Sequence, residues 1–169
     1  MAASIAFELV SAPRDASHRS ADGAGSLGYV CAMPEETCLE GLHCTMTIAS
    51  PGPGVILVTI VGTDVGELGE APFRAMAPLM RDGVELFIDA RGARGPAIDV
   101  SNDWAAWLSK NRGQLRHASM LTASRFVQLT ADFVRRFADL GDAMRIYTEP
   151  AVFEGALSNA VGNARSTRR

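Results

Sequence analysis

Strand-like and helix-like segments alternate along most of this chain, from residue 44 to residue 161. The run Val55–Val61 is apolar and rich in β-branched residues, and it is long enough for a buried strand. The turn-forming cluster Ser50–Gly54 joins it to the alternating segment Thr45–Ile48, which predicts a β-hairpin. The alternation that follows is typical of parallel strands joined by right-handed crossovers. The sequence therefore predicts an α/β fold: a four- to five-stranded mixed sheet, with the hairpin as its antiparallel edge, and about four helices.

Individual residues mark the ends of the later elements. Pro72 starts the first predicted helix, Pro78 should kink it, and Ser124 should cap the third helix. The second helix begins near Ser101 and the last one near Pro150. The strands between the helices are predicted at Val84–Asp89, Ala118–Thr122 and Met144–Tyr147.

Three of the helices carry apolar residues at helical spacing, and we expect these stripes to face the core. The stripes are Trp104, Trp107 and Leu108 in the second helix; Phe126, Leu129, Phe133, Val134, Phe137 and Leu140 in the third; and Val152, Phe153, Ala156 and Leu157 in the last.

Length, charge and the N-terminal residues limit the class of protein. The chain has 169 residues, 47% of them hydrophobic, which suits one globular domain. A formal net charge of -3 argues against a nucleic-acid-binding protein, whose surface is usually basic. The N-terminus lacks the positive start of a secretion signal, and no run approaches the roughly 18 apolar residues of a membrane span. We expect a soluble, cytoplasmic protein.

The composition divides the chain into three regions. Residues 1–43 are predicted to be an N-terminal extension of one or two strands plus a mobile loop. Ile5–Val10 is one short strand, Ser11–Gly28 is the loop, and Tyr29–Leu42 has no clear pattern. Residues 44–161 form the α/β domain, and residues 162–169 form a polar, basic tail.

A short motif lies where the second helix begins. The strand that ends at Asp89 is followed by a loop and then by the segment Ala97–Asn102, of sequence AIDVSN. The motif and the order of elements over roughly residues 44–161 resemble the STAS domain of bacterial anti-sigma-factor antagonists. In that family an apolar-Asp-Ser-Ser-Gly segment opens the second helix. Ile98 and Asp99 match the apolar-Asp pair, and Ser101 falls on the second serine.

The resemblance implies a non-enzymatic signalling domain that binds another protein. Its implied partner is a serine kinase of the anti-sigma type, with Ser101 as the phosphate acceptor. We expect the partner-binding surface at the start of the second helix and on the arginine-containing loop before it, with Asp99, Asn102, Asp103, Trp104, Arg91 and Arg94 as its residues.

Each of these residues also has a purely structural interpretation. Ser101 is placed to cap the helix, because a serine hydroxyl can accept a bond from an unpaired backbone N–H. Asp99 is a second capping residue or a polar partner for Ser101. Trp104 and Trp107 are expected to pack in the core, and the Arg91–Pro96 loop to be solvated.

A second resemblance supports a different function. The segment Tyr147–Phe153 is similar to the last strand and helix of the STAS/Sec14-like branch, whose members are associated with apolar ligands. The alternative function is therefore a binding module for an apolar small molecule or lipid. That function requires a pocket between the helices and the sheet.

The cysteines argue against a metal site and against catalysis. Cys31, Cys38, His43 and Cys44 lack the close pairs of ligands that zinc sites use, so no metal or cofactor is expected. A hydrolase that used Cys31 or Cys44 would need a histidine within hydrogen-bond reach. The only histidines are His18, His43 and His117, and no local signature of a catalytic site surrounds any cysteine.

Overall fold

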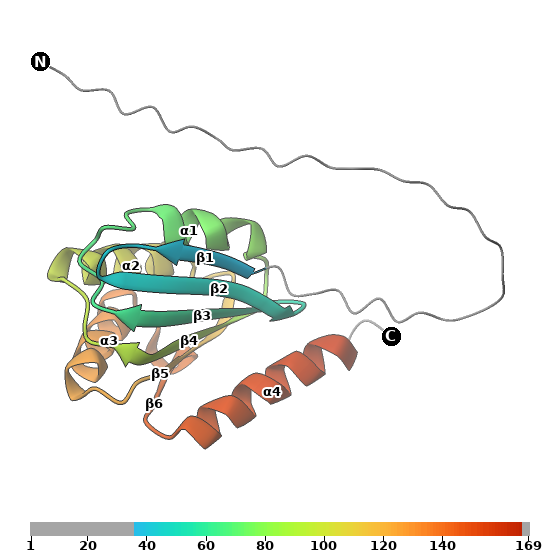
Figure 1. Ribbon diagram of the computed structural model, residues 1–169. Helices are drawn as coiled ribbons and strands as arrows, with labels where there is room; N and C mark the ends of the chain where they lie inside the picture. Colours follow the sequence, from blue (N-terminus) through green and yellow to red (C-terminus); the bar gives the residue numbers. More distant parts are fainter. Residues whose placement is uncertain (1–35, 167–169) are drawn as a thin grey trace, which may run out of the picture. The chain divides into compact units, whose positions relative to one another are not determined.

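A computed structural model describes residues 36–166, which belong to one compact unit (Figure 1). The predicted strand Ile5–Val10 and the predicted loop after it lie outside the described residues.

A single six-stranded sheet forms the centre of the domain, and its strands lie side by side in chain order. The first two pairings are antiparallel and the other three are parallel. The strands are β1 (Glu36–Glu40), β2 (Cys44–Gly52), β3 (Val55–Gly62), β4 (Val84–Ala93), β5 (Leu115–Leu121) and β6 (Met144–Tyr147). The mixed sheet and the β2–β3 hairpin confirm the prediction, but the expected count of four to five strands was too low.

The strand β1 falls within residues 1–43, the predicted extension. It is an edge strand of five residues with four of them exposed, so its sequence has almost no alternation of apolar and polar residues. Only Leu39 is packed against the core, beside Met46 of β2 in the strand register. A strand that buries one side chain gives no periodic signal, which explains why the prediction of one or two strands in the extension did not locate it.

Helices cover both faces of the sheet (Figure 1). The larger core lies between one face and α1, α2 and α3, and the smaller core between the other face and α4. The helices are α1 (Ala71–Met76), α2 (Ile98–Asn111), α3 (Arg125–Phe137) and α4 (Pro150–Ser166), with 3₁₀ turns η1 (Ala77–Leu79) and η2 (Gly141–Ala143). Burial on both faces explains the unbroken apolar run of β3: Ile56 and Val58 join the larger core, and Val55 joins the smaller one.

Three of the predicted helix ends can be compared with the structure. The hydroxyl of Ser124 accepts a hydrogen bond from the N–H of Val127 at 3.4 Å, which confirms it as the cap of α3. Pro78 lies in the 3₁₀ turn that replaces α-helix after Met76. The predicted cap of α2 is wrong: that helix begins at Ile98, and Ser101 lies inside its first turn.

The orientation predicted for α3 is also wrong for four of its six stripe residues. Phe126, Leu129, Phe133 and Phe137 are between 46% and 63% exposed. The face of α3 that packs against the sheet instead carries the smaller side chains Val127, Ala131 and Val134. Both sets recur at helical spacing, and the smaller one lets the helix approach the sheet and α2 closely. Likewise, Val152 of α4 was expected to point inward and is exposed.

One carboxylate holds the turn between β1 and β2. Glu67, in the segment after β3, accepts hydrogen bonds from the backbone N–H groups of Leu42, His43 and Cys44 at 2.9, 2.7 and 2.8 Å. The bond from His43 above all favours the ionised form and lowers the pKa of Glu67, against the opposite effect of burial. No local pattern around Glu67 indicated this role, because its partners lie more than twenty residues away in the chain.

Candidate functional site

The predicted site residues lie around the segment that joins β4 to α2, and their side chains point in three directions. This segment follows the carboxyl end of a parallel strand, where open α/β sheets usually bind ligands. The backbone N–H of Ala97 donates a 2.8 Å bond to the carbonyl of Asp64, which follows β3. This bond fixes the start of α2 over the ends of both strands. From there the helix directs some side chains to solvent and others into the core.

The first group points outward. Asp99, Asn102 and Asp103 are exposed on α2, and Arg94 is exposed just before it. None of these four side chains has a hydrogen-bond or ion-pair partner within residues 36–166. Beside them stands Ile98, which is 80% exposed. The start of α2 therefore presents one large apolar side chain among unpaired polar groups.

The second group points inward. Ser101 is only 6% exposed, and its hydroxyl donates a 3.1 Å hydrogen bond to the carbonyl oxygen of Ala97. Trp104 is buried and packs edge-on against Phe73, with ring centroids 5.2 Å apart. Trp107 stacks on the same ring at 5.7 Å. The core-packing interpretation of the two tryptophans is confirmed.

Arg91 forms the third group, because it lies on the other face of the sheet. Its guanidinium bonds to Asp89 at 2.7 Å and to Glu154 of α4 at 3.1 Å. Burial raises the pKa of Asp89, but the hydrogen bonds from Arg91 outweigh it and hold that pKa below its usual value. The predicted loop over residues 91–96 was too long, since β4 continues to Ala93. Arg91 and Arg94 therefore do not form one surface.

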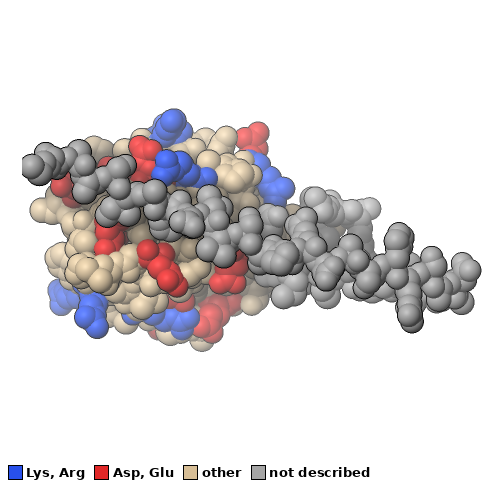
Figure 2. Space-filling model, turned by 45° about the horizontal axis from the view of Figure 1, so that its top comes forward, with Lys and Arg blue, Asp and Glu red and all other residues tan. Residues whose placement is uncertain are grey.

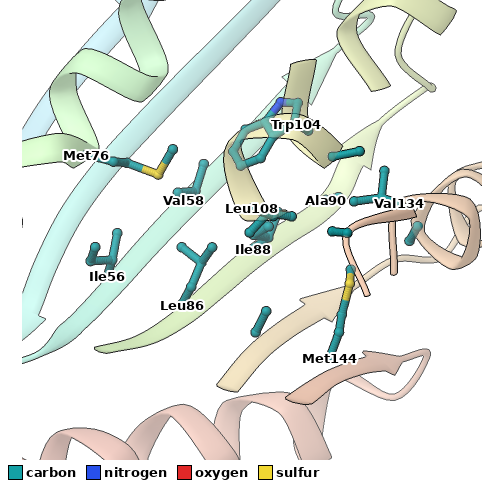
Figure 3. Packing of buried hydrophobic residues seen from close by; sticks show 14 of the residues in the cluster. Ile56, Val58, Met76, Leu86, Ile88, Ala90, Trp104, Leu108, Val134 and Met144 are labelled. Carbon is teal, nitrogen blue, oxygen red and sulfur yellow. The ribbon is translucent and has the colours of Figure 1, made fainter. Parts of the chain in front are cut away.

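A cavity of about 70 Å³ lies between the sheet and helices α2 and α3. Figure 3 shows part of its wall, where Trp104 and Leu108 of α2 meet Ile88, Ala90, Val134 and Met144. Three polar side chains, Asp64, Ser101 and Thr130, also line it.

Each of these polar groups is engaged by backbone. Ser101 and Thr130 donate to carbonyl oxygens of their own helices, at 3.1 and 3.2 Å. Asp64 accepts from the N–H of Gly66 at 3.0 Å. The interior of the cavity is therefore apolar in character. Gly95 lines the cavity, and a side chain at this position would collide with the ring of Phe126. The ring of Phe126 therefore lies over the loop beside the cavity.

The thiols do not form a reactive site in the described part of the chain. Burial, and then the carboxylates of Asp64 and Glu67, raise the pKa of Cys44 to about 11. A thiol with that pKa is protonated at neutral pH and is a poor nucleophile. Cys38 is exposed on β1, and Cys31 lies outside the described residues. Within residues 36–166, no three metal-ligating side chains converge.

No helix within residues 36–166 is both long and apolar enough to cross a bilayer.

The comparisons with known proteins found similar solved structures, among them the following two. An anti-sigma factor antagonist from Mycobacterium paratuberculosis is 14% identical, with a TM-score of 0.49 over 68% of this chain and 94% of that one. An uncharacterised protein with a SpoIIAA-like fold from Shewanella loihica is 10% identical, with a TM-score of 0.46 over 77% of this chain and 99% of that one. No family model and no curated protein matches the chain. These likenesses concern the fold alone.

Proposed function

We propose that this domain is a non-enzymatic regulatory module that binds another protein through the start of α2. The observation that carries the proposal is the exposure of Ile98 among the unpaired side chains of Arg94, Asp99, Asn102 and Asp103. An apolar residue ringed by polar groups is the usual composition of a protein interface, where the centre excludes water and the rim supplies specificity.

The backbone beneath this surface is well fixed. The bond from Ala97 to Asp64 anchors the helix start, and Val100 and Trp104 hold its first turns against the core. A partner would therefore bind a preformed surface and lose little free energy in ordering it. The partner that we propose is a serine kinase of the anti-sigma type.

A phosphate switch at Ser101 is part of the proposal, and the structure sets a condition for it. The hydroxyl is buried and bonded to Ala97, so the first turn of α2 must open before a kinase can reach it. Once attached, the phosphate would lie at the positive end of a helix but beside Asp99 and Asp103. The modification would therefore disturb the surface that the partner binds.

Mass spectrometry of the protein from its own host tests the switch. We expect phosphate on Ser101 and none on Ser109, an exposed serine of the same helix that serves as the control. Ser101→Asp should weaken kinase binding at least tenfold, and Ser101→Ala should not. The switch is rejected if Ser101 is unmodified and both variants bind as the wild type does.

Calorimetric titration with a purified anti-sigma-type kinase from the same genome tests the surface itself. Ile98→Glu should abolish binding, because it places a charge at the centre of the interface. Val152→Glu is the matched control, since Val152 is an exposed apolar residue on α4. Equal effects of the two substitutions would refute the α2 surface.

The cavity favours a second candidate function, the binding of an apolar small molecule. Its volume of about 70 Å³ is smaller than that of engineered cavities that bind benzene, about 150 Å³. It would therefore hold one end of an acyl chain rather than a whole lipid. Native mass spectrometry of the freshly purified protein tests this function: an adduct that disappears on denaturation supports it, and a spectrum of the bare chain alone argues against it.

A further inference from the structure

The exposed side of α3 carries an apolar stripe that lies largely in solvent. Phe126, Leu129, Phe133 and Phe137, here called the α3 stripe, recur three or four residues apart and so share one side of the helix. The rings of Phe133 and Phe137 stack with centroids 5.8 Å apart. Large exposed apolar patches are rare on monomeric proteins and usually mark an interaction site.

The unpaired charges on α3 are all positive. Arg125 and Arg136 are exposed, and neither has an ion-pair partner within residues 36–166. The one acidic residue of α3, Asp132, pairs with Arg135 at 2.9 Å, and Asp139, just after the helix, pairs with Arg112 of the turn after α2. Elsewhere the two signs are mixed: on the face shown in Figure 2, acidic and basic side chains are interspersed.

The spacing of the two arginines suits a helical partner. They are eleven residues apart, which is close to three turns and about 16 Å along the helix axis. Eleven residues make about three full turns of an α-helix, so the two arginines lie on the same side of the α3 stripe. A second helix packed on the stripe would meet both if it carried carboxylates at the same spacing.

We propose that the α3 stripe binds an amphipathic helix of another protein, with acidic residues beside its apolar face. A second copy of this chain fits less well, because it would bring the same unpaired arginines and no unpaired carboxylate on α3. An anionic membrane also fits less well, because the chain has a net charge of -3 and Asp132 lies on the same helix. The stripe lies on α3 rather than at the start of α2, so this inference goes beyond the function proposed above.

Fluorescence anisotropy with two designed peptides tests the proposal on the full chain. Both probes are labelled 18-residue helices with one leucine face, and its flanks carry glutamate in one and lysine in the other. We expect the glutamate peptide to bind at least tenfold more tightly, with an affinity that falls as salt rises. Replacing Arg125 and Arg136 by glutamate should reverse the preference, whereas Arg74→Glu on α1 should leave it unchanged.

Phe133→Ser and Phe137→Ser test the apolar part of the surface. Each should weaken binding of the glutamate peptide at least tenfold without lowering the thermal midpoint, because both side chains are exposed. Should either variant fail to fold, the charge reversal decides the question alone. Equal binding of the two peptides, or binding of neither, would overturn the proposal. So would a dimer in sedimentation that Phe133→Ser dissolves, or capture by vesicles of phosphatidylglycerol.

Discussion

Glu67 is a single side chain that holds the turn at the edge of the sheet. Three backbone N–H groups of the β1–β2 turn share its carboxylate, so one residue satisfies donors that no strand pairing reaches. Hydrogen bonds to an ionised carboxylate are stronger than neutral ones. The edge of the sheet therefore depends on the charge of Glu67.

Glu67→Gln should destabilise the domain at neutral pH and have little effect in acid. The pKa of Glu67 is lowered in the folded state, so its stabilisation is complete above the unfolded value of about 4.3 and is lost as pH falls through the folded value. Urea midpoints of the wild type and the variant at pH 7 and pH 3 check this. Glu70→Gln, at an exposed residue nearby, is the control. A difference that persists undiminished at pH 3 would contradict the role of the charge.

The two described cysteines should differ in reactivity. Cys38 is exposed, whereas Cys44 is buried with a pKa raised to about 11, so its thiolate is scarce at pH 8. Peptide mapping after iodoacetamide treatment of the native protein should find Cys38 modified and Cys44 intact. In guanidinium chloride both should react. Rapid modification of native Cys44 would restore the hydrolase interpretation.

The sequence placed the motif at the start of the second helix, but it did not predict the directions of the side chains. The spacing located the segment correctly, and the structure places Ile98, Asp99, Ser101 and Asn102 in the first turns of one helix. The direction of each side chain depends on where the helix begins. A start three residues earlier than predicted turned Ser101 into the core and left Ile98 in solvent.

At the scale of elements, α3 shows why a stripe of large apolar residues does not always identify the buried face. The helix has two sets of apolar positions, and burial selects the set that fits the space above the sheet. Val127, Ala131 and Val134 fit beside α2, and phenylalanines there would hold the two helices apart. The periodicity of a sequence carries no information on the distance between two helices, so it could not predict which face of α3 is buried.

The cavity beneath α2 and α3 predicts opposite effects for the same substitution at two sites. Val134→Ile adds a methylene at the cavity wall, where it should stabilise the domain by up to about 0.8 kcal/mol. Val58→Ile adds the same group at a packed position and should destabilise by about 1–3 kcal/mol. Chemical denaturation of both variants measures the difference. Equal destabilisation would mean that the space near Val134 does not admit a methylene.

For the whole molecule, the alternation of strands and helices predicted the class of fold, the hairpin and the parallel sheet. It could do so because β3 and β4 are buried on both faces and helix-forming segments separate the parallel strands. Three features depend on long-range contacts and were not located from the sequence: the residues that form the edge strand β1, the binding of Arg91 by Glu154 of α4, and the side chains that line the cavity. The residues predicted for the site therefore face three directions, and their role in binding stays a prediction.

Photo-crosslinking in the native host tests whether the start of α2 is a protein-binding surface. The residue p-benzoylphenylalanine would replace Ile98 in one variant and Val152 of α4 in another, both exposed positions on helices. We predict a discrete adduct with one partner protein from position 98, which Asp99→Arg and Asp103→Arg together remove, and no such adduct from position 152. No adduct from position 98, or the same adducts from both positions, would contradict the account.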